Sequence, residues 1–387
     1  MSAAELSEHA GYLGDLIKLA AYEQAFNSVL RAGSSVVLDL GSGTGILGLL
    51  AAKCGADRVF AVDSGAIIGP AAEVAAASNV ADRIVHIRGR STELQLPEPA
   101  NVAVCDQIGG FVYDAGILAY FADARARLLA TDATLIPARF RMFLAPAECR
   151  RVREQIDLWS ASPAGFDFAA FSELAANTEY RVDADEVRLL ANGVQVADIA
   201  ADHIAAITGT GDATFHSTGR CDGLVGFFEA DMGGGATLTN HPTVAARMRR
   251  WCNFYPMSTG LQVEAGYTAV VKVDVRPALR AVTWTTTVTD ASQSLLVSER
   301  HSTLMGTFLA HDDLGRAGGR PITVSPTGTA VATALQLADG NRSTGDVLAT
   351  VKAGLTEGSW SSALEETLRD QLERFTSPVS DSSDRPF

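Results

Sequence analysis

A glycine-rich segment near the N-terminus constrains the fold more than any other feature of the chain. The continuous apolar run Val36–Leu40 is typical of a strand covered on both faces, and Gly41–Gly45 follows it as a turn. We expect a helix at Ile46–Cys54 and a second strand at Arg58–Val62, which ends at Asp63. A strand, loop, helix and strand of these lengths predict a parallel, doubly wound α/β sheet.

The same alternation continues to about residue 139. Further helices are expected at residues 5–31, Ala71–Ser78 and Ile117–Leu129, and further strands at Ile84–Ile87 and Val102–Cys105. We therefore assign residues 1–139 to an N-terminal helix and the α/β domain.

The pattern changes after Ile136-Pro137. Short β-branched runs separated by turn residues predict an antiparallel β domain over residues 140–311, a barrel or a sandwich. A glycine- and charge-rich linker at Asp312–Arg320 precedes a small, mostly helical unit at residues 321–376. In that unit we expect a strand at Pro321–Val324, then helices at Thr329–Leu337, Thr344–Lys352 and Ser361–Phe375.

Composition narrows the function classes. The 387 residues carry a formal net charge of −14, which argues against a nucleic-acid partner. The five cysteines are scattered, and this spacing favours neither a disulfide framework nor a zinc site. No signal peptide and no apolar run of membrane-spanning length is recognisable, so we expect no membrane association and a cytoplasmic location.

The loop also carries chemistry. Its spacing, Gly41-x-Gly43-x-Gly45, is one residue shorter than a dinucleotide fingerprint and suits the amino acid end of a ligand better than a pyrophosphate. Asp63 ends the next strand, where its carboxylate can accept hydrogen bonds from both hydroxyls of a ribose. The alternative is a glycine turn that binds nothing.

These motifs resemble the protein arginine methyltransferases, a branch of the class I enzymes that depend on S-adenosylmethionine. The stretch Leu38–Asp63 is close to that family's first motif, the residues from His9 to Tyr22 follow its N-terminal helix, and Gly89–Pro97 matches its adenine-lining stretch. The resemblance implies S-adenosylmethionine as cofactor, with Lys18 in place of the arginine that grips the cofactor carboxylate. The implied cofactor residues are His9, Lys18, Asp39, Gly41, Gly43, Gly45, Asp63, Ser64, Ser91 and Thr92.

The resemblance covers roughly residues 8–310. Ala164–Phe168, Gly223–Phe228 and Val263–Gly266 are similar to segments of the family's β domain. It implies a Rossmann-like sheet followed by an antiparallel β-barrel that binds the acceptor. It also implies a homodimer, formed through an arm that residues 150–180 could supply.

The acceptor site departs from the family. Asp106 falls on the first of the family's two acceptor glutamates, and Asp114 lies one residue before the second. The family's Thr-His-Trp loop reads Arg249-Arg250-Trp251, which places positive charge where a carboxylate would be held better than a guanidinium. The alternative for this basic run is an ordinary surface patch. The candidate catalytic residues are Asp106, Asp114, Arg249, Arg250 and Trp251.

The unit at residues 321–376 lies outside this resemblance. Ser325–Leu348 is similar to the winged-helix domains that bind the leader segments of ribosomally made natural-product peptides, although any three-helix bundle could share its turn and helix cap.

The sequence therefore favours a methyltransferase that modifies a peptide, plausibly a ribosomal natural-product precursor, with carboxyl O-methylation slightly ahead. The first alternative is an arginine N-methyltransferase acting on a protein or peptide. The second is a degenerate, non-catalytic subunit that binds a peptide.

Overall fold

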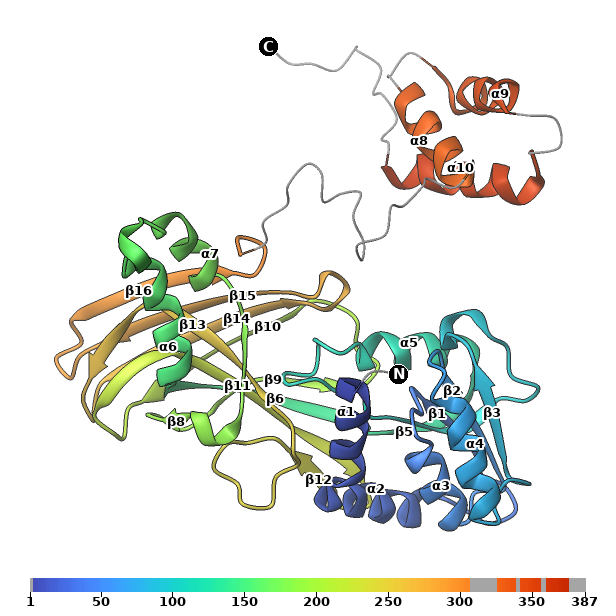
Figure 1. Ribbon diagram of the computed structural model, residues 1–387, viewed down its shortest axis with the longest axis horizontal. Helices are drawn as coiled ribbons and strands as arrows, with labels where there is room; N and C mark the ends of the chain where they lie inside the picture. The colour runs from blue at the N-terminus through green and yellow to red at the C-terminus, as the bar shows by residue number, and fades with distance from the viewer. Residues whose placement is uncertain (1–2, 307–325, 339–341, 356–359, 376–387) are drawn as a thin grey trace. The chain divides into compact units, whose positions relative to one another are not determined.

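The computed structural model describes residues 3–306, 326–338, 342–355 and 360–375 (Figure 1). The chain divides into two compact units, Met1–Phe308 and Leu309–Phe387, and each is described here by itself. In the first unit a parallel sheet is followed by antiparallel sheets, as the sequence predicts.

The parallel sheet has five strands in the order β3-β2-β1-β4-β5. The central strand β1 has an almost uninterrupted buried pattern because neighbouring strands and helices cover it on every side. Its strands are β1 (Val36–Leu40), β2 (Arg58–Asp63), β3 (Ile84–Arg88), β4 (Ala100–Cys105) and β5 (Leu129–Ile136). The helices beside it are α1 (Ala3–Leu13), α2 (Leu16–Val29), α3 (Ile46–Lys53), α4 (Ile68–Ala77) and α5 (Ile117–Arg127), with the 3-10 turn η1 (Ser91–Glu93).

Two elements differ from the sequence prediction. The helix expected over residues 5–31 is two helices, because Asp15 begins a new helix by accepting a hydrogen bond from the backbone N–H of Lys18. The helix expected to reach Leu129 ends at Arg127, and the edge strand β5 that follows is absent from the prediction. Thr131 and Asp132, exposed in the middle of β5, hide its strand pattern.

The strands after residue 139 pair as two antiparallel sheets in the described residues, rather than as one hydrogen-bonded barrel. The two sheets share one apolar core, and the indole Nε1 of Trp284 joins them by donating to the carbonyl of Pro256 at 2.9 Å. One sheet contains β6 (Arg139–Glu148), β7 (Tyr180–Val182), β8 (Arg188–Leu189), β9 (Val194–Ala200), β11 (Gly219–Gly233), β12 (Ala236–Thr239) and β13 (Cys252–Val263). The other contains β10 (Ile207–Thr214), β14 (Thr268–Arg276), β15 (Ala281–Thr289) and β16 (Leu295–Ser302).

A helical segment between β6 and β7 exposes aromatic side chains. Trp159 stacks on Phe171 at 5.1 Å between ring centroids, while Phe166 is 67% exposed. We call residues 150–176 the arm; it contains α6 (Arg150–Asp157), η2 (Leu158–Ser160), η3 (Pro163–Gly165), η4 (Ala169–Phe171) and α7 (Ser172–Ala176). The remaining 3-10 turns are η5 (Ala184–Glu186) and η6 (Pro277–Leu279).

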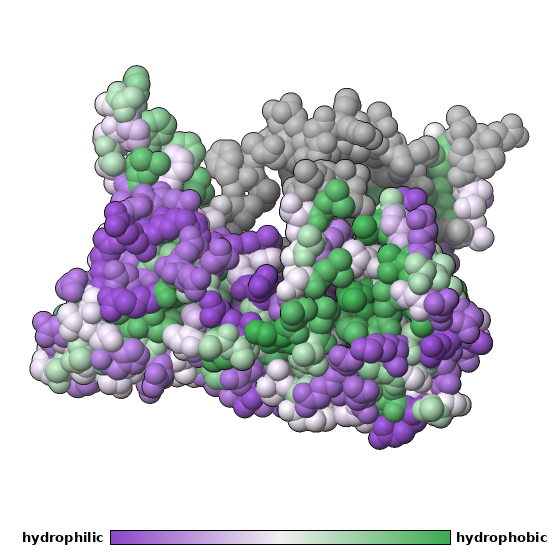
Figure 2. All heavy atoms as spheres, turned by 60° about the horizontal axis from the view of Figure 1, so that its bottom comes forward, coloured by the Kyte–Doolittle hydropathy of each residue, from purple (hydrophilic) through white to green (hydrophobic). Residues whose placement is uncertain are grey.

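The N-terminal helices carry a second exposed apolar surface. Leu6, Leu13, Leu16 and Ile17 are each more than two-fifths exposed. Figure 2 shows hydrophobic surface gathered on the side of the first unit that carries these helices, beside a mostly hydrophilic antiparallel part.

The described part of the second unit is three helices, α8 (Pro326–Leu337), α9 (Thr344–Gly354) and α10 (Ser362–Phe375), around a small core of their own. Ser343 caps α9 in a reciprocal box with Asp346, as the sequence predicts for this position. The strand expected at Pro321–Val324 lies outside the described residues. No helix in the described ranges is long and apolar enough to cross a membrane.

Candidate active site

The glycine loop turns the chain sharply from β1 into α3. Gly41, Gly43 and Gly45 all adopt positive φ, at 69°, 55° and 82°, where any other residue would be strained. Asp39 fixes the turn from below, since its Oδ2 accepts hydrogen bonds from Ser42 Oγ at 2.8 Å and from the N–H of Gly48 at 3.0 Å. Burial raises the pKa of Asp39 to about 7. Asp39 therefore lies beneath the loop, 1% exposed, rather than in its opening.

Asp63 joins the loop to the end of β2. Its Oδ2 accepts from the N–H of Gly43 at 2.8 Å and its Oδ1 from the N–H of Gly65 at 2.6 Å. The half-buried carboxylate thus faces the opening at the carboxyl ends of the strands, where ligands of doubly wound sheets bind.

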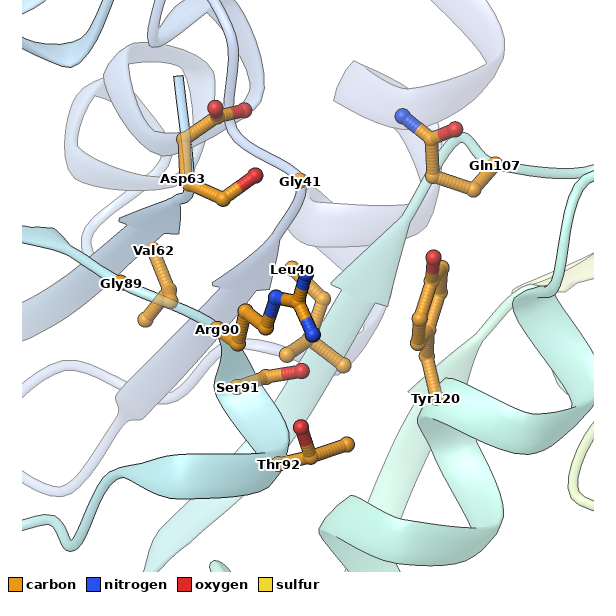
Figure 3. Close-up of a pocket in the computed structure, with 11 residues that line it drawn as sticks. Leu40, Gly41, Val62, Asp63, Gly89, Arg90, Ser91, Thr92, Gln107 and Tyr120 are labelled. Atoms are coloured by element: carbon orange, nitrogen blue, oxygen red, sulfur yellow. The ribbon is translucent and has the colours of Figure 1, made fainter. Parts of the chain in front are cut away.

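A cavity of about 560 Å³ opens at this edge (Figure 3). Five predicted cofactor residues line it: Gly41, Asp63, Ser64, Ser91 and Thr92. The other lining residues are Leu40, Val62, Gly89, Arg90, Gln107 and Tyr120.

Three of these additional residues have polar side chains that sequence reasoning missed as ligand contacts. Arg90 projects into the cavity and Tyr120 of α5 lies across from it, while Gln107 lies on the far side from Asp63 (Figure 3). Arg90 lies inside the stretch Gly89–Pro97 that resembles the family's adenine-lining segment, so the sequence could have indicated it as a cavity residue. Gln107 and Tyr120 reach the cavity only through the packing of β4 and α5.

The other predicted cofactor residues lie around the loop. A Cβ added to Gly43 would lie 3.3 Å from the His9 ring, so His9 covers the loop, while Gly45 packs against Ala71 of α4. Lys18 is buried and points to Asp106 instead of into the cavity lining.

Asp106 stands at the centre of an ion-pair network. Lys18 Nζ lies 2.7 Å from its Oδ2, and Nη2 of Arg250 lies 3.0 Å from its Oδ1 and 3.3 Å from its carbonyl oxygen. Tyr22 donates its hydroxyl to the carbonyl of Cys105 at 3.1 Å. The network brings together three predicted residues from the N-terminal helix, the loop after β4 and the loop before β13.

Asp15 ties the same loops together on another side. Its Oδ1 accepts from the N–H of Lys18 at 3.1 Å, and its Oδ2 accepts from the N–H of Arg249 at 2.7 Å. Asp15 belongs to the N-terminal motif that carries the resemblance, but no role was predicted for it from the sequence.

Asp114 closes the loop in which it lies. Its carboxylate accepts from the N–H groups of Gly110 at 2.9 Å and Phe111 at 3.0 Å. A Cβ on Gly110 would lie 2.2 Å from Asn253 Oδ1 and 2.6 Å from Trp251 Nε1, so this glycine permits close contact with β13 and the residue before it. Asn240 Nδ2 strengthens that contact by donating to the carbonyls of Gly110 and Trp251.

A further carboxylate, Glu179, reaches this region from the residue just before β7. The hydroxyl of Tyr113 and the Nδ2 of Asn253 both donate to Glu179 Oε2, the second at 3.3 Å. Burial raises the pKa of Glu179, with Asp114 adding to the rise and the two hydrogen bonds and Arg181 opposing it. Sequence reasoning missed it, because nothing local to Glu179 indicates this contact.

Arg249, Arg250 and Trp251 line a second cavity, of about 560 Å³. Arg249 is exposed there, whereas Arg250 turns its guanidinium back to Asp106. The other residues that line this second cavity are Ile17, Asp183, Ala184, Asp185, Ala245, Arg247 and Met248. The described residues hold no group of His, Cys, Asp and Glu side chains placed for a metal ion.

Comparison with known proteins agrees with this geometry. Residues 19–137 match the family model of ribosomal protein L11 methyltransferase. The chain is 38% identical over 136 residues to protein arginine N-methyltransferase 1 of Schizosaccharomyces pombe, covering 35% of the chain and 40% of that relative. It is 26% identical over 259 residues to histone-arginine methyltransferase CARMER of Anopheles gambiae, covering 62% of the chain and 41% of the relative. The chain thus spans about two-fifths of the length of these relatives.

A bacterial relative matches over more of its length. The arginine N(omega)-methyltransferase of Streptomyces achromogenes subsp. streptozoticus is 27% identical over 274 residues, which are 68% of this chain and 75% of that protein.

Two solved structures share the fold. The Trypanosoma brucei PRMT1 enzyme-prozyme complex with AdoHcy superposes with a TM-score of 0.66 at 22% identity, over 76% of this chain and 97% of that chain. Arabidopsis thaliana protein arginine methyltransferase 10 superposes with a TM-score of 0.65 at 19% identity, over 77% and 98%. The chain is thus similar in sequence to the ribosomal protein L11 methyltransferase family over residues 19–137 and to arginine methyltransferases, and it shares the fold of the two solved structures.

Proposed function

We propose that the protein transfers a methyl group from S-adenosylmethionine to a guanidinium nitrogen of arginine. The observation that carries this proposal is the ion pair between Arg250 and Asp106. The sequence assigned Arg250 to hold a carboxyl acceptor, but its guanidinium is engaged by Asp106, so Arg250 is already paired and does not hold a carboxylate acceptor. The named relatives favour the same acceptor over the carboxyl oxygen that the sequence favoured.

The residues of the first cavity fit the cofactor. We assign Asp63 to the ribose hydroxyls and Ser91 and Thr92 to the adenine, because all three line this cavity. We assign His9 to the cover of the glycine loop, because its ring lies beside Gly43. Lys18 is the one Lys or Arg side chain of α1 and α2, and we propose it for the cofactor carboxylate although its Nζ contacts Asp106 in this structure. When bound, S-adenosylmethionine supplies an electrophilic methyl group on a sulfonium.

The chain's own contribution is orientation. Carboxylates would hold the planar guanidinium with one nitrogen facing the methyl group that S-adenosylmethionine supplies. The new N–C bond would form as the S–C bond breaks and S-adenosylhomocysteine leaves, and the nitrogen's proton would pass to a carboxylate of the site. Asp106 and Asp114 lie on the loop after β4, at the sheet edge that carries the cofactor cavity.

We further propose a peptide as the carrier of the arginine. The second cavity is lined by Asp183 and Asp185 beside Arg247, Arg249 and Arg250, so it offers both charges to the polar groups of a peptide chain. Recognition of a leader segment by the second unit remains a proposal, supported by its helix order and the cap at Ser343. Titration of the full chain with peptides that carry or lack a leader segment tests it.

A homodimer is proposed from two exposed apolar surfaces. The arm exposes Leu158, Phe166 and Phe171, and the N-terminal helices expose Leu13 and Leu16. Different surfaces that fit one another produce head-to-tail contacts, which close into a ring when the rotation permits.

Mass spectrometry tests the acceptor. We incubate the enzyme and S-adenosylmethionine with arginine peptides and expect a one-methyl mass increase that maps to arginine and survives mild alkali. A methyl group lost to alkali would identify an ester and contradict the proposal. Absence of calorimetric binding of S-adenosylmethionine would instead support a non-catalytic subunit.

A further inference from the structure

Both acceptor carboxylates that the sequence identifies are already engaged by the chain. Asp106 contacts Lys18 and Arg250, so this trio holds two positive charges against one negative charge. Asp114 accepts two backbone N–H groups from its own loop. A guanidinium that approached Asp106 would therefore meet a net positive group, and Asp114 alone offers a single negative charge.

Glu179 supplies a second negative charge beside Asp114. Burial raises the pKa of Glu179, and the negative charge of Asp114 adds to the rise. Tyr113, one residue before Asp114, donates its hydroxyl to Glu179, so the segment between the arm and β7 is in direct contact with the acceptor loop after β4. The charged side chain of Arg181 faces the same group and leaves the set of three with one net negative charge.

Unsatisfied hydrogen-bonding groups surround Glu179. Both of its side-chain hydrogen bonds reach Oε2, and in the described residues no donor is recorded at Oε1. Asn253 is only 2% exposed, and its Oδ1 has no hydrogen-bond partner among the described residues. A buried acceptor without a donor is costly, and a guanidinium brings five N–H donors.

The neighbouring aromatic ring already receives a guanidinium. The Arg181 guanidinium carbon lies 4.3 Å from the centroid of the Trp251 ring. Planar cations pack on such faces in low-dielectric sites, so the surroundings of Glu179 suit the same group from an acceptor.

We propose that Glu179, with Asp114, binds the acceptor guanidinium and takes the place of the carboxylate that Lys18 and Arg250 neutralise at Asp106. This inference rests on the proposed arginine N-methylation. Glu179 thereby determines the specificity of the site for a planar cation. Asn253 holds the carboxylate through Nδ2 and offers Oδ1 to the same acceptor.

The test compares E179Q with E173Q, an exposed glutamate of the adjacent helix α7, in the full chain. Glutamine keeps the shape of Glu179 and its capacity to accept from Tyr113 while removing the charge. The probes are free L-arginine and the blocked peptide acetyl-Gly-Gly-Arg-Gly-Gly-amide. We expect E179Q to lower kcat/KM by about 100-fold or more, and to weaken calorimetric binding of the probe that the wild type prefers by about tenfold in the presence of S-adenosylhomocysteine.

Three controls separate this role from a structural one. E179Q should keep the wild-type Kd for S-adenosylhomocysteine, E173Q should behave as wild type, and E179D should recover part of the lost kcat/KM. The wild-type kcat/KM should rise with pH as Glu179 ionises. The titratable and charged groups that surround Glu179 are Tyr113, Asp114, Arg181 and Tyr255. E179Q should show no such rise of kcat/KM with pH.

Two outcomes overturn the inference in different ways. If the wild type methylates either probe and E179Q does so equally well, the role of Glu179 is wrong while the proposed function stands. If the wild type methylates neither probe and instead forms an alkali-labile ester on a carboxyl peptide, the proposed function fails and this role fails with it.

Discussion

Arg250 and Lys18 share one carboxylate, that of Asp106, and both cations are almost completely buried, with side chains 3% and 2% exposed. We predict that D106N destabilises the protein by about 3–5 kcal/mol, because it leaves two buried positive charges without a counter-charge. Urea denaturation measures the change. The double variant D106N/K18M should recover part of the loss, since one of the two cations is removed. A D106N midpoint equal to that of the wild type would show that the network adds nothing to stability.

Asp63 is expected to control cofactor affinity. D63A removes a carboxylate that holds two loop N–H groups and faces the cavity, at a cost of about 1.5–3 kcal/mol for a charged hydrogen bond. The Kd for S-adenosylhomocysteine should rise by about 10- to 100-fold in calorimetry. D82N, at an exposed position before β3, is the matched control and should leave the Kd unchanged.

Gly110 should be intolerant of any side chain. The Cβ of G110A would lie 2.2 Å from Asn253 Oδ1, so the loop that carries Asp106 and Asp114 must move. We expect methyl transfer to fall at least about tenfold while cofactor binding persists, because the displaced carboxylate of Asp114 no longer orients the acceptor. G69A, in α4, meets nothing within 4 Å and should keep full activity with equal or greater stability.

Asp39 should make stability depend on pH. Its folded-state pKa of about 7 lies above the ordinary value of 3.8, so the folded protein binds more protons than the unfolded chain between these values. The free energy of unfolding is therefore expected to fall as pH rises through this window, by up to about 1.4 kcal/mol per pH unit from this group. D39N should flatten that slope in denaturation at pH 5 and pH 7, and a slope unchanged by D39N would contradict the assignment.

The arm should control oligomeric state. F166S removes a 67% exposed aromatic ring from the proposed contact, and we expect it to shift the sedimentation coefficient from dimer to monomer. L279S changes a side chain of similar exposure, 68%, on the separate turn η6 and should leave the dimer intact. Equal sedimentation of F166S and the wild type would exclude the arm from the contact.

The features that the sequence predicted well are local ones. Gly41–Gly45 and Asp63 stand at the carboxyl ends of two predicted strands. Because parallel strands bring these ends to one edge of the sheet, the position of the cavity could be predicted from the sequence. Asp106 was identified through the resemblance, because it falls on the first of the family's two acceptor glutamates. Its partners were not predicted together, because Lys18 and Arg250 reach it across 88 and 144 residues.

The missed features depend on tertiary packing or on weak local patterns. Glu179 meets Tyr113 and Asn253 across 66 and 74 residues, and its own neighbourhood reads as an ordinary helix end followed by a short strand. The edge strand β5 carries Thr131 and Asp132 on its exposed part, so its apolar pattern is interrupted. The break between α1 and α2 at Gly14-Asp15 depends on the N-cap hydrogen bond of Asp15, and the spacing of apolar residues does not reveal such a cap.

The carboxylate of Asp15 accepts a hydrogen bond from the backbone N–H of Arg249, which lies 234 residues later in the chain. During synthesis the N-terminal helices leave the ribosome long before that partner exists. The N-terminal helices beside the glycine loop therefore gain this hydrogen bond only after most of the antiparallel strands have been translated. A nascent chain that stops before Arg249 would have its complete parallel sheet, but its N-terminal helices would lack the hydrogen bond from Arg249 to Asp15.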